Sequence, residues 1–186
     1  LMWHGHPSGL KDDVVTPLLD ATREPPVMPA AFADAQKELD AGTWAKARAT
    51  LQTAVDGGKL SKIDAAWAKG VVKWIEMRRG KVIGEGDALE KQTWYWDAWW
   101  TFDDFTRRFE GMEGCDVAKQ KADAVRASAA TIPAAKLDLE WGDDLAKAKD
   151  WLAKGKPVPA KLICERLSKV KSRFADRAKE LLSSLQ

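Results

Sequence analysis

The feature that most constrains this chain is an aromatic stretch at residues 91–111. It contains four of the ten tryptophans, the only tyrosine and three of the five phenylalanines. At about 100° per residue, one face of a helix over this stretch would carry Tyr95, Ala98, Trp99, Phe102, Phe105 and Phe109. Such a stripe is typical of a helix that packs one face into a core.

Trp96 and Trp100 lie outside that stripe. They are four residues apart and therefore share one side of the helix, roughly 130–170° away from the stripe. The helix is thus aromatic on two sides, which leaves two alternatives. Either neighbouring helices cover both sides, or the side of Trp96 and Trp100 meets a partner. Exposed tryptophan is common at binding hot spots, so these two residues are candidate partner-binding residues.

Helical spacing of apolar residues continues through most of the chain from residue 29. No stretch of period-two alternation is long enough to indicate a strand. The pattern predicts a helix over residues 61–79, then a loose connection at the glycines within residues 80–86, and it leaves a later helix open to interruption at Gly142. The predicted fold class is all-α, with antiparallel helical hairpins joined by short loops.

Three segments of the chain share one pattern around a helix junction. Each begins with a junction residue, has an alanine five positions later, and has apolar or small residues four and seven positions beyond that alanine. The junction residues are Gly42, Thr93 and Gly155, and the alanines are Ala47, Ala98 and Ala160. The residues that follow are Leu51 and Ala54, Phe102 and Phe105, and Cys164 and Leu167. The alanine lets the second helix of each hairpin approach the first.

This pattern resembles the tetratricopeptide repeat (TPR), whose junction reads G-x-Y-x-x-A. The first segment also has Ala35, and the third Ala148, where the family has a small residue. The segments are 51 and 62 residues apart instead of about 34, Thr93 replaces a glycine, and Pro157 replaces an aromatic residue. The resemblance implies an irregular TPR-like domain over residues 29–186, stacked as a right-handed superhelix.

Residues 1–28 are predicted to form an extended N-terminal arm, because five prolines fall within the first 29 residues. The arm begins with the apolar residues Leu1, Met2 and Trp3. These three are candidate partner-binding residues, since an apolar end would be buried either against the chain's own core or against another subunit.

The arm also contains the only two histidines, His4 and His6. In an extended segment, the alternating Met2, His4 and His6 would lie on one side. Thioether and imidazole groups suit copper, and two imidazoles suit zinc, so the histidine pair is a candidate metal site. The alternative is a solvated or packed arm that binds no metal.

The two cysteines, Cys115 and Cys164, are 49 residues apart and form no CxxC motif. This spacing excludes the zinc-finger, haem-attachment and thioredoxin-type motifs. The chain begins at Leu1 and fits a mature form left after removal of a signal peptide, so we expect an extracellular or periplasmic protein. In that setting the two cysteines should either form a disulfide or both be buried.

The sequence contains no pattern typical of a catalytic centre. No histidine follows the arm, so serine and threonine have no candidate base there. The adjacent aspartate pairs, such as Asp103 and Asp104, would point about 100° apart on a helix and solvate its surface. We therefore expect no enzyme activity, no catalytic residue and no cofactor.

The charge distribution also restricts the class of partner. The net charge is only +2, and residues of both signs are interspersed, unlike the basic face of a nucleic-acid-binding protein. No apolar run approaches the roughly 18 residues of a membrane span. Nucleic acid is therefore not an expected partner, and no membrane-spanning segment is predicted.

These observations favour a non-catalytic, exported helical-repeat protein that mediates protein–protein contacts. The expected partner is the chain itself, in a homo-oligomer or extracellular filament, or another protein. Two alternatives stay open: a module that binds a glycan or other polymer through exposed tryptophan, and a periplasmic metal-handling protein that uses His4 and His6.

Removal of residues 1–10 tests the role of the arm. If a second copy holds the arm, the truncated chain should keep its helical fold and lose its higher-order species. If the same chain holds it, the truncation should lower the melting temperature and leave the oligomeric state unchanged. Sedimentation velocity and thermal melting by circular dichroism distinguish these results. A truncated chain that assembles at the same concentration as the intact one refutes the arm's role in assembly.

Overall fold

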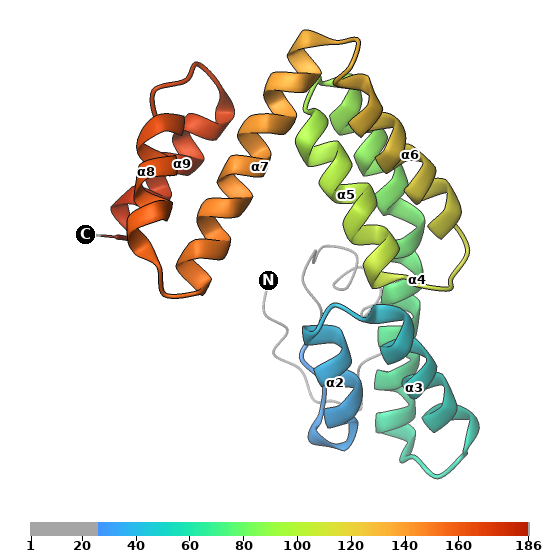
Figure 1. Cartoon of the computed structure of the whole chain (residues 1–186). Helices are drawn as coiled ribbons and strands as arrows, with labels where there is room; N and C mark the ends of the chain where they lie inside the picture. The colour runs from blue at the N-terminus through green and yellow to red at the C-terminus, as the bar shows by residue number, and fades with distance from the viewer. Residues whose placement is uncertain (1–25, 186) are drawn as a thin grey trace. The chain divides into compact units, whose positions relative to one another are not determined.

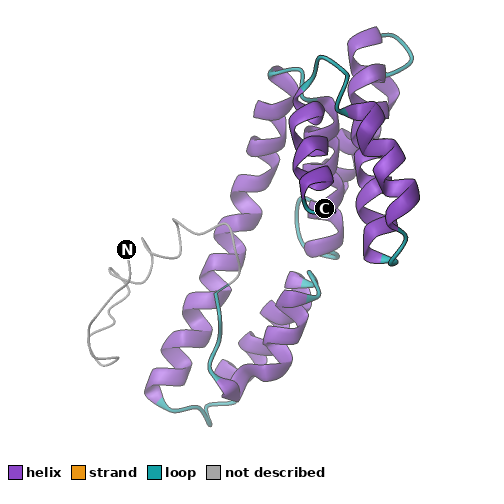
Figure 2. Ribbon diagram, turned by 90° about the vertical axis from the view of Figure 1, so that its left-hand side faces the viewer, coloured by secondary structure: helices purple, strands orange, loops and turns teal. Residues whose placement is uncertain are grey.

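The computed structural model describes residues 26–185, and the regular structure in this range is helical (Figures 1 and 2). In chain order the elements are the short 3₁₀ helix η2 (Ala30–Phe32) and the α-helices α2 (Ala33–Asp40), α3 (Trp44–Asp56), α4 (Lys62–Lys91), α5 (Tyr95–Arg108), α6 (Cys115–Ser128), α7 (Pro133–Ala153), α8 (Pro157–Leu167) and α9 (Arg173–Ser183). The prediction of an all-α fold is confirmed for these residues. None of the described helices is long and apolar enough to cross a lipid bilayer.

The three repeated junctions share one backbone geometry. Gly42, Thr93 and Gly155 have positive φ angles of 72°, 62° and 67°. In each case the next residue donates its N–H to the carbonyl five positions earlier, over 2.8–3.0 Å. This combination is the Schellman motif, which ends a helix through a residue in the left-handed conformation. The pattern found in the sequence therefore corresponds to the same local backbone geometry at all three junctions.

The alanines of the three segments are also equivalent in the structure. Ala47, Ala98 and Ala160 are all fully buried. Neighbouring helices pack against one another, as in the pairs α2 with α3, α7 with α8 and α8 with α9. Helical hairpins are thus present, whereas their stacking as a TPR-like superhelix stays a prediction.

Helix α4 is longer than the sequence pattern predicts. The predicted end near residue 79 and the loose connection after it are wrong, because α4 continues through Gly80 and Gly84 to Lys91. A glycine costs a helix about 0.5–1 kcal/mol relative to alanine, which contacts along the helix can offset. Here the Nη1 atom of Arg78 donates to Oε1 of Glu85 at 3.0 Å across the glycine-containing turns.

The described part of the chain divides into two compact units. The first contains residues 26–85 and 101–120, and the second contains residues 86–100 and 121–185. The core of the first unit is centred on Trp44, whose ring lies 4.9 Å from that of Trp74 and 5.5 Å from that of Phe109. The indole Nε1 of Trp44 donates to the carbonyl of Leu39 at 3.2 Å, so its buried polar group has a partner.

The second unit has its own apolar core, formed by α7, α8 and α9. Its buried members are Leu145, Ala148, Ala160, Cys164, Leu167, Phe174 and Ala178. The three helices pack against one another and are joined by the short loops at residues 154–156 and 168–172 (Figure 1). This three-helix packing forms one wall of the candidate site.

The exposed glycines of α4 generate a stability prediction. A Cβ atom added at Gly80 or Gly84 would meet nothing within 4 Å. We therefore expect Gly80→Ala and Gly84→Ala each to raise the free energy of unfolding by about 0.5–1 kcal/mol. Urea denaturation checks this. Gly58→Ala is the matched control: its site is equally open but has a φ of 66°, so the same change should destabilise the protein. Unchanged or lower stability in both α4 variants contradicts the prediction.

Candidate functional site

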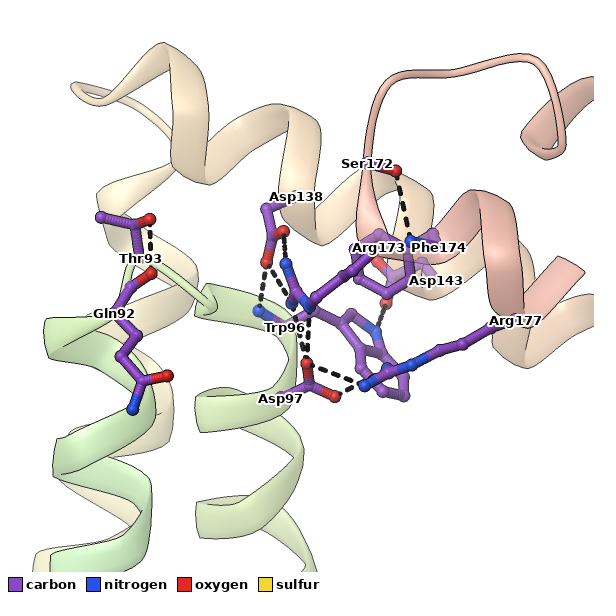
Figure 3. A network of polar contacts seen from close by, with 10 residues as sticks. All are labelled: Gln92, Thr93, Trp96, Asp97, Asp138, Asp143, Ser172, Arg173, Phe174 and Arg177. Carbon is purple, nitrogen blue, oxygen red and sulfur yellow. Dashed lines mark hydrogen bonds and ion pairs between the residues drawn. The ribbon is translucent and has the colours of Figure 1, made fainter.

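The first turn of α5, near the start of the aromatic stretch, is capped by a side chain of α7. The backbone N–H of Trp96, in the first turn of α5, donates to Oδ2 of Asp138 on α7 at 2.9 Å (Figure 3). The first amides of a helix have no partner within the helix, and the helix dipole favours a negative charge there. Asp138 supplies both the hydrogen-bond acceptor and the negative charge, although it is only 7 % exposed.

The indole of Trp96 lies on the backbone of Gly142. A Cβ atom at residue 142 would stand 1.9 Å from Cγ of Trp96, so no larger residue fits without a shift. The Nε1 atom of Trp96 donates to Oδ1 of Asp143 at 3.1 Å, and its ring meets Phe174 edge-on at 6.2 Å. Trp96, which is half-buried, therefore packs against α7 and α9. Gly142 does not interrupt α7 but makes room for this ring.

Two arginines on α9 complete the polar network. Arg173 donates to both carboxylate oxygens of Asp138, through its Nη1 and Nη2 atoms, and its Nε donates to Oδ2 of Asp97 at 2.9 Å (Figure 3). Arg177 donates to Oδ1 of Asp97, also at 2.9 Å. Burial lowers the pKa of Arg173, but Asp138 and Asp97 outweigh that effect and raise it. The charges of Asp138 on α7 and of Asp97 on α5 are thus paired and hydrogen-bonded through Arg173.

A third arginine joins α6 to the same site. Arg126 donates to both oxygens of Asp143, at 2.7 and 2.8 Å, and its guanidinium lies 3.6 Å from the centre of the Trp99 ring. Such a placement combines a bidentate ion pair with a cation–π contact. Burial raises the pKa of the Asp143 carboxyl, but Arg126 and the Trp96 indole outweigh it and hold the pKa below its usual value.

The outer side of this cluster is aromatic and exposed. Trp100 is 45 % exposed, and its ring stacks on that of Trp96 at 5.7 Å with only 7° between the planes. Trp99 lies beside it at 6.1 Å. We call the rings of Trp99 and Trp100 the Trp100 surface. Trp94, which precedes α5, is 39 % exposed and lies near the guanidinium of Arg173.

An open cleft of about 740 Å³ lies next to Arg126 and Asp143. It is lined by the end of α6, the following loop and the start of α7, including Lys136, Leu139 and Glu140. Its charged groups are of both signs, and Arg126 is already paired with Asp143. The cleft therefore contains no concentration of one charge that would select an anionic or a cationic ligand.

The other predicted site residues have different outcomes. Leu1, Met2, Trp3, His4 and His6 lie outside the described residues. Within residues 26–185, no three side chains of His, Cys, Asp or Glu are placed to hold a metal ion.

Both cysteines are free thiols in the structure. Cys164 is fully buried in the core of the second unit, and burial raises its pKa. Cys115 is half-buried at the start of α6, where its Sγ donates to the carbonyl of Phe109 at 2.7 Å. A disulfide between the two stays a prediction.

Sequence reasoning missed several residues of the network. Asp138 and Arg173 were not singled out, although an aspartate between Leu137 and Leu139 in an apolar helix is a recognisable sign of a buried, paired carboxylate. Asp143 and Asp144 form another adjacent aspartate pair, which sequence reasoning assigns to the solvated surface of a helix. The role of Asp143 as the acceptor for Trp96 depends on a contact between distant segments.

Comparison with protein-family models, with curated proteins and with solved structures gives no significant match.

The contact between Trp96 and Gly142 predicts that the loss of stability caused by Gly142→Ala disappears or reverses when Trp96 is replaced by alanine. In the intact protein, Gly142→Ala should lower the free energy of unfolding by about 1–3 kcal/mol, because the new methyl group displaces the indole. In a Trp96→Ala background the clash is absent, so Gly142→Ala should be neutral or stabilising, as alanine favours a helix. Urea denaturation of the four proteins completes the cycle. Equal effects in both backgrounds would show that the ring does not constrain residue 142.

The lowered pKa of Asp143 predicts an acid-sensitive contribution to stability. Its folded-state pKa lies below that of the unfolded chain, which is about 3.9. The contribution is therefore present above about pH 4 and is lost as the pH falls through the folded-state pKa. Between pH 6 and pH 3, Asp143→Asn should lose less stability than the intact protein. Asp150→Asn is the control, because Asp150 forms only an exposed pair with Lys154. A steeper acid loss in Asp143→Asn contradicts the prediction.

Proposed function

We propose that this chain is a non-catalytic protein of helical hairpins that self-associates through the Trp100 surface. The observation that carries the proposal is a tryptophan that is 45 % exposed and stacked flat on a second, fixed tryptophan. Tryptophan and arginine are the residues most enriched at the energetic centres of protein interfaces. The Trp100 surface contains two tryptophans, with Arg126 packed against Trp99.

The support beneath Trp100 strengthens the proposal. The Trp96 ring on which it stacks is held by Gly142, Asp143 and Phe174. A side chain that is already ordered loses little conformational entropy when a partner covers it, so more of the contact energy appears as affinity. A rigid, exposed indole is therefore better suited to binding than a mobile one.

The wider proposal concerns the assembly. The repeated Schellman junctions support a TPR-like array, and helical arrays end in faces that a further subunit can cover. A contact between two different faces of the same chain would form a ring or an open filament. We propose such an oligomer or filament in an extracellular or periplasmic setting, with the residue 1–28 arm as a second possible contact.

A glycan or other polymer is a second candidate partner for the Trp100 surface. The angle of 7° between the Trp96 and Trp100 rings gives a flat face, and aromatic faces stack on apolar ring surfaces. Affinity electrophoresis in gels that contain soluble polysaccharides distinguishes this candidate. Retardation that Trp100→Ala abolishes would favour the glycan, whereas unchanged migration with concentration-dependent association would favour the protein partner.

Substitution of Trp100 tests self-association directly. Loss of a hot-spot tryptophan costs about 2 kcal/mol or more, so Trp100→Ala should weaken the association constant roughly 30-fold. Sedimentation velocity over a range of concentrations provides the measurement. Ile63→Ala, which removes an apolar side chain of similar exposure on α4, should leave association unchanged. A wild-type chain that is monomeric throughout the micromolar range, or equal effects of both substitutions, would overturn the proposal.

A further inference from the structure

The outward side of α8 is an apolar face that no described residue covers. Val158 and Leu162 are 70 % and 63 % exposed and lie one helical turn apart. The opposite side of α8, with Ala160, Cys164 and Leu167, is fully packed into the core of the second unit. The inner side therefore anchors the helix, while Val158 and Leu162 remain in contact with solvent.

The surroundings of this face are basic. Residues 154–171 include six lysine or arginine residues and only one acidic residue, Glu165. Lys154 is paired with Asp150, and Arg166 with Asp144. The exposed side chains of Lys161, Lys169 and Lys171 form no ion pair with any described residue, and Lys156 lies over the ring of Trp151, 5.0 Å from its centre. We call Val158, Leu162 and Lys161 on α8, together with Lys169 and Lys171 in the loop that follows, the α8 outer face.

This composition selects the chemistry of an occupant. It should present aliphatic side chains close to carboxylates, so that burial of Val158 and Leu162 is accompanied by pairing of the lysines. The chain contains one segment of this kind outside the described residues. Residues 12–24 have four acidic residues and one basic residue, together with Val14, Val15, Leu18 and Leu19.

We propose that the α8 outer face binds residues 12–24 of this chain. The inference rests on the proposed self-association, in which a neighbouring copy donates the segment. It assigns the acidic part of the residue 1–28 arm to a defined acceptor surface. An anionic lipid surface is less well matched, since lipid-binding clusters contain about four to eight basic residues, and the four here without an ion pair, Lys156 among them, stand at the lower end of that range beside the carboxylate of Glu165.

A labelled synthetic peptide of residues 10–26 tests the proposal against the full chain. Fluorescence anisotropy should show saturable binding that weakens at high salt. The double variant Val158→Ser with Leu162→Ser should weaken peptide binding at least tenfold. Its circular dichroism spectrum should match that of the intact protein, because both side chains are exposed. Val117→Ser is the matched control, since Val117 is a half-exposed side chain on α6 and should not affect binding.

A second peptide tests the charge complementarity. With its four acidic residues replaced by asparagine or glutamine, it should bind at least tenfold more weakly. The proposal is overturned if the neutral peptide binds as tightly as the acidic one. It is also overturned if the double variant binds the acidic peptide as tightly as the intact chain does. A third outcome would assign the face to lipid and would also overturn the proposal. In that outcome the chain binds phosphatidylserine-containing vesicles but not the peptide, and the double variant loses vesicle binding.

The peptide titration is separable from the test of the proposed function. Because the peptide is supplied in solution, its binding is measured whether or not the chain self-associates. If Trp100→Ala abolishes association while the double variant binds the peptide normally, the self-association stands and the present inference fails. If the chain is monomeric but binds the peptide through α8, the proposed function fails and recognition of residues 12–24 stands.

Discussion

The second unit depends on how the first turn of α5 is satisfied. The N–H groups of a helix start must find acceptors outside the helix, and Trp96 finds one in Asp138. A carboxylate that is only 7 % exposed requires a compensating charge, which Arg173 supplies from α9. The same guanidinium also binds Asp97. One requirement for a capping group thus leads to an ionic network that joins α5, α7 and α9.

The apolar contact beside this network determines its orientation. Ion pairs alone tolerate sliding between helices, whereas the Trp96 ring fits only where α7 has no side chain, at Gly142. The indole Nε1 then reaches Asp143, which Arg126 holds from α6. The hydrogen bonds and the steric fit thus favour the same arrangement of these helices. Such agreement between interactions favours a single packed state.

Much of the fold was accessible from local patterns, and most of the site was not. The helices, the three junctions and the buried Ala47, Ala98 and Ala160 follow from periodicity and turn chemistry that a short window of sequence contains. Glycine was misleading at Gly80 and Gly142, because its meaning depends on what faces it: open space at Gly80, and an indole at Gly142. The partners of Asp138 and Trp96 are distant in sequence, so no local pattern identifies them.

The difference in burial between Trp96 and Trp100 links the fold to the proposed function. Both lie on one side of α5, but only Trp96 is placed where α7 offers a glycine and a carboxylate. Trp100 is one turn further along, and it gains a stacking contact without becoming covered. Internal packing therefore fixes the orientation of an exposed ring whose apolar area is still in contact with water. A partner that covers Trp100 removes this area from water at little further cost in side-chain entropy, which is the thermodynamic reason to expect binding at this position.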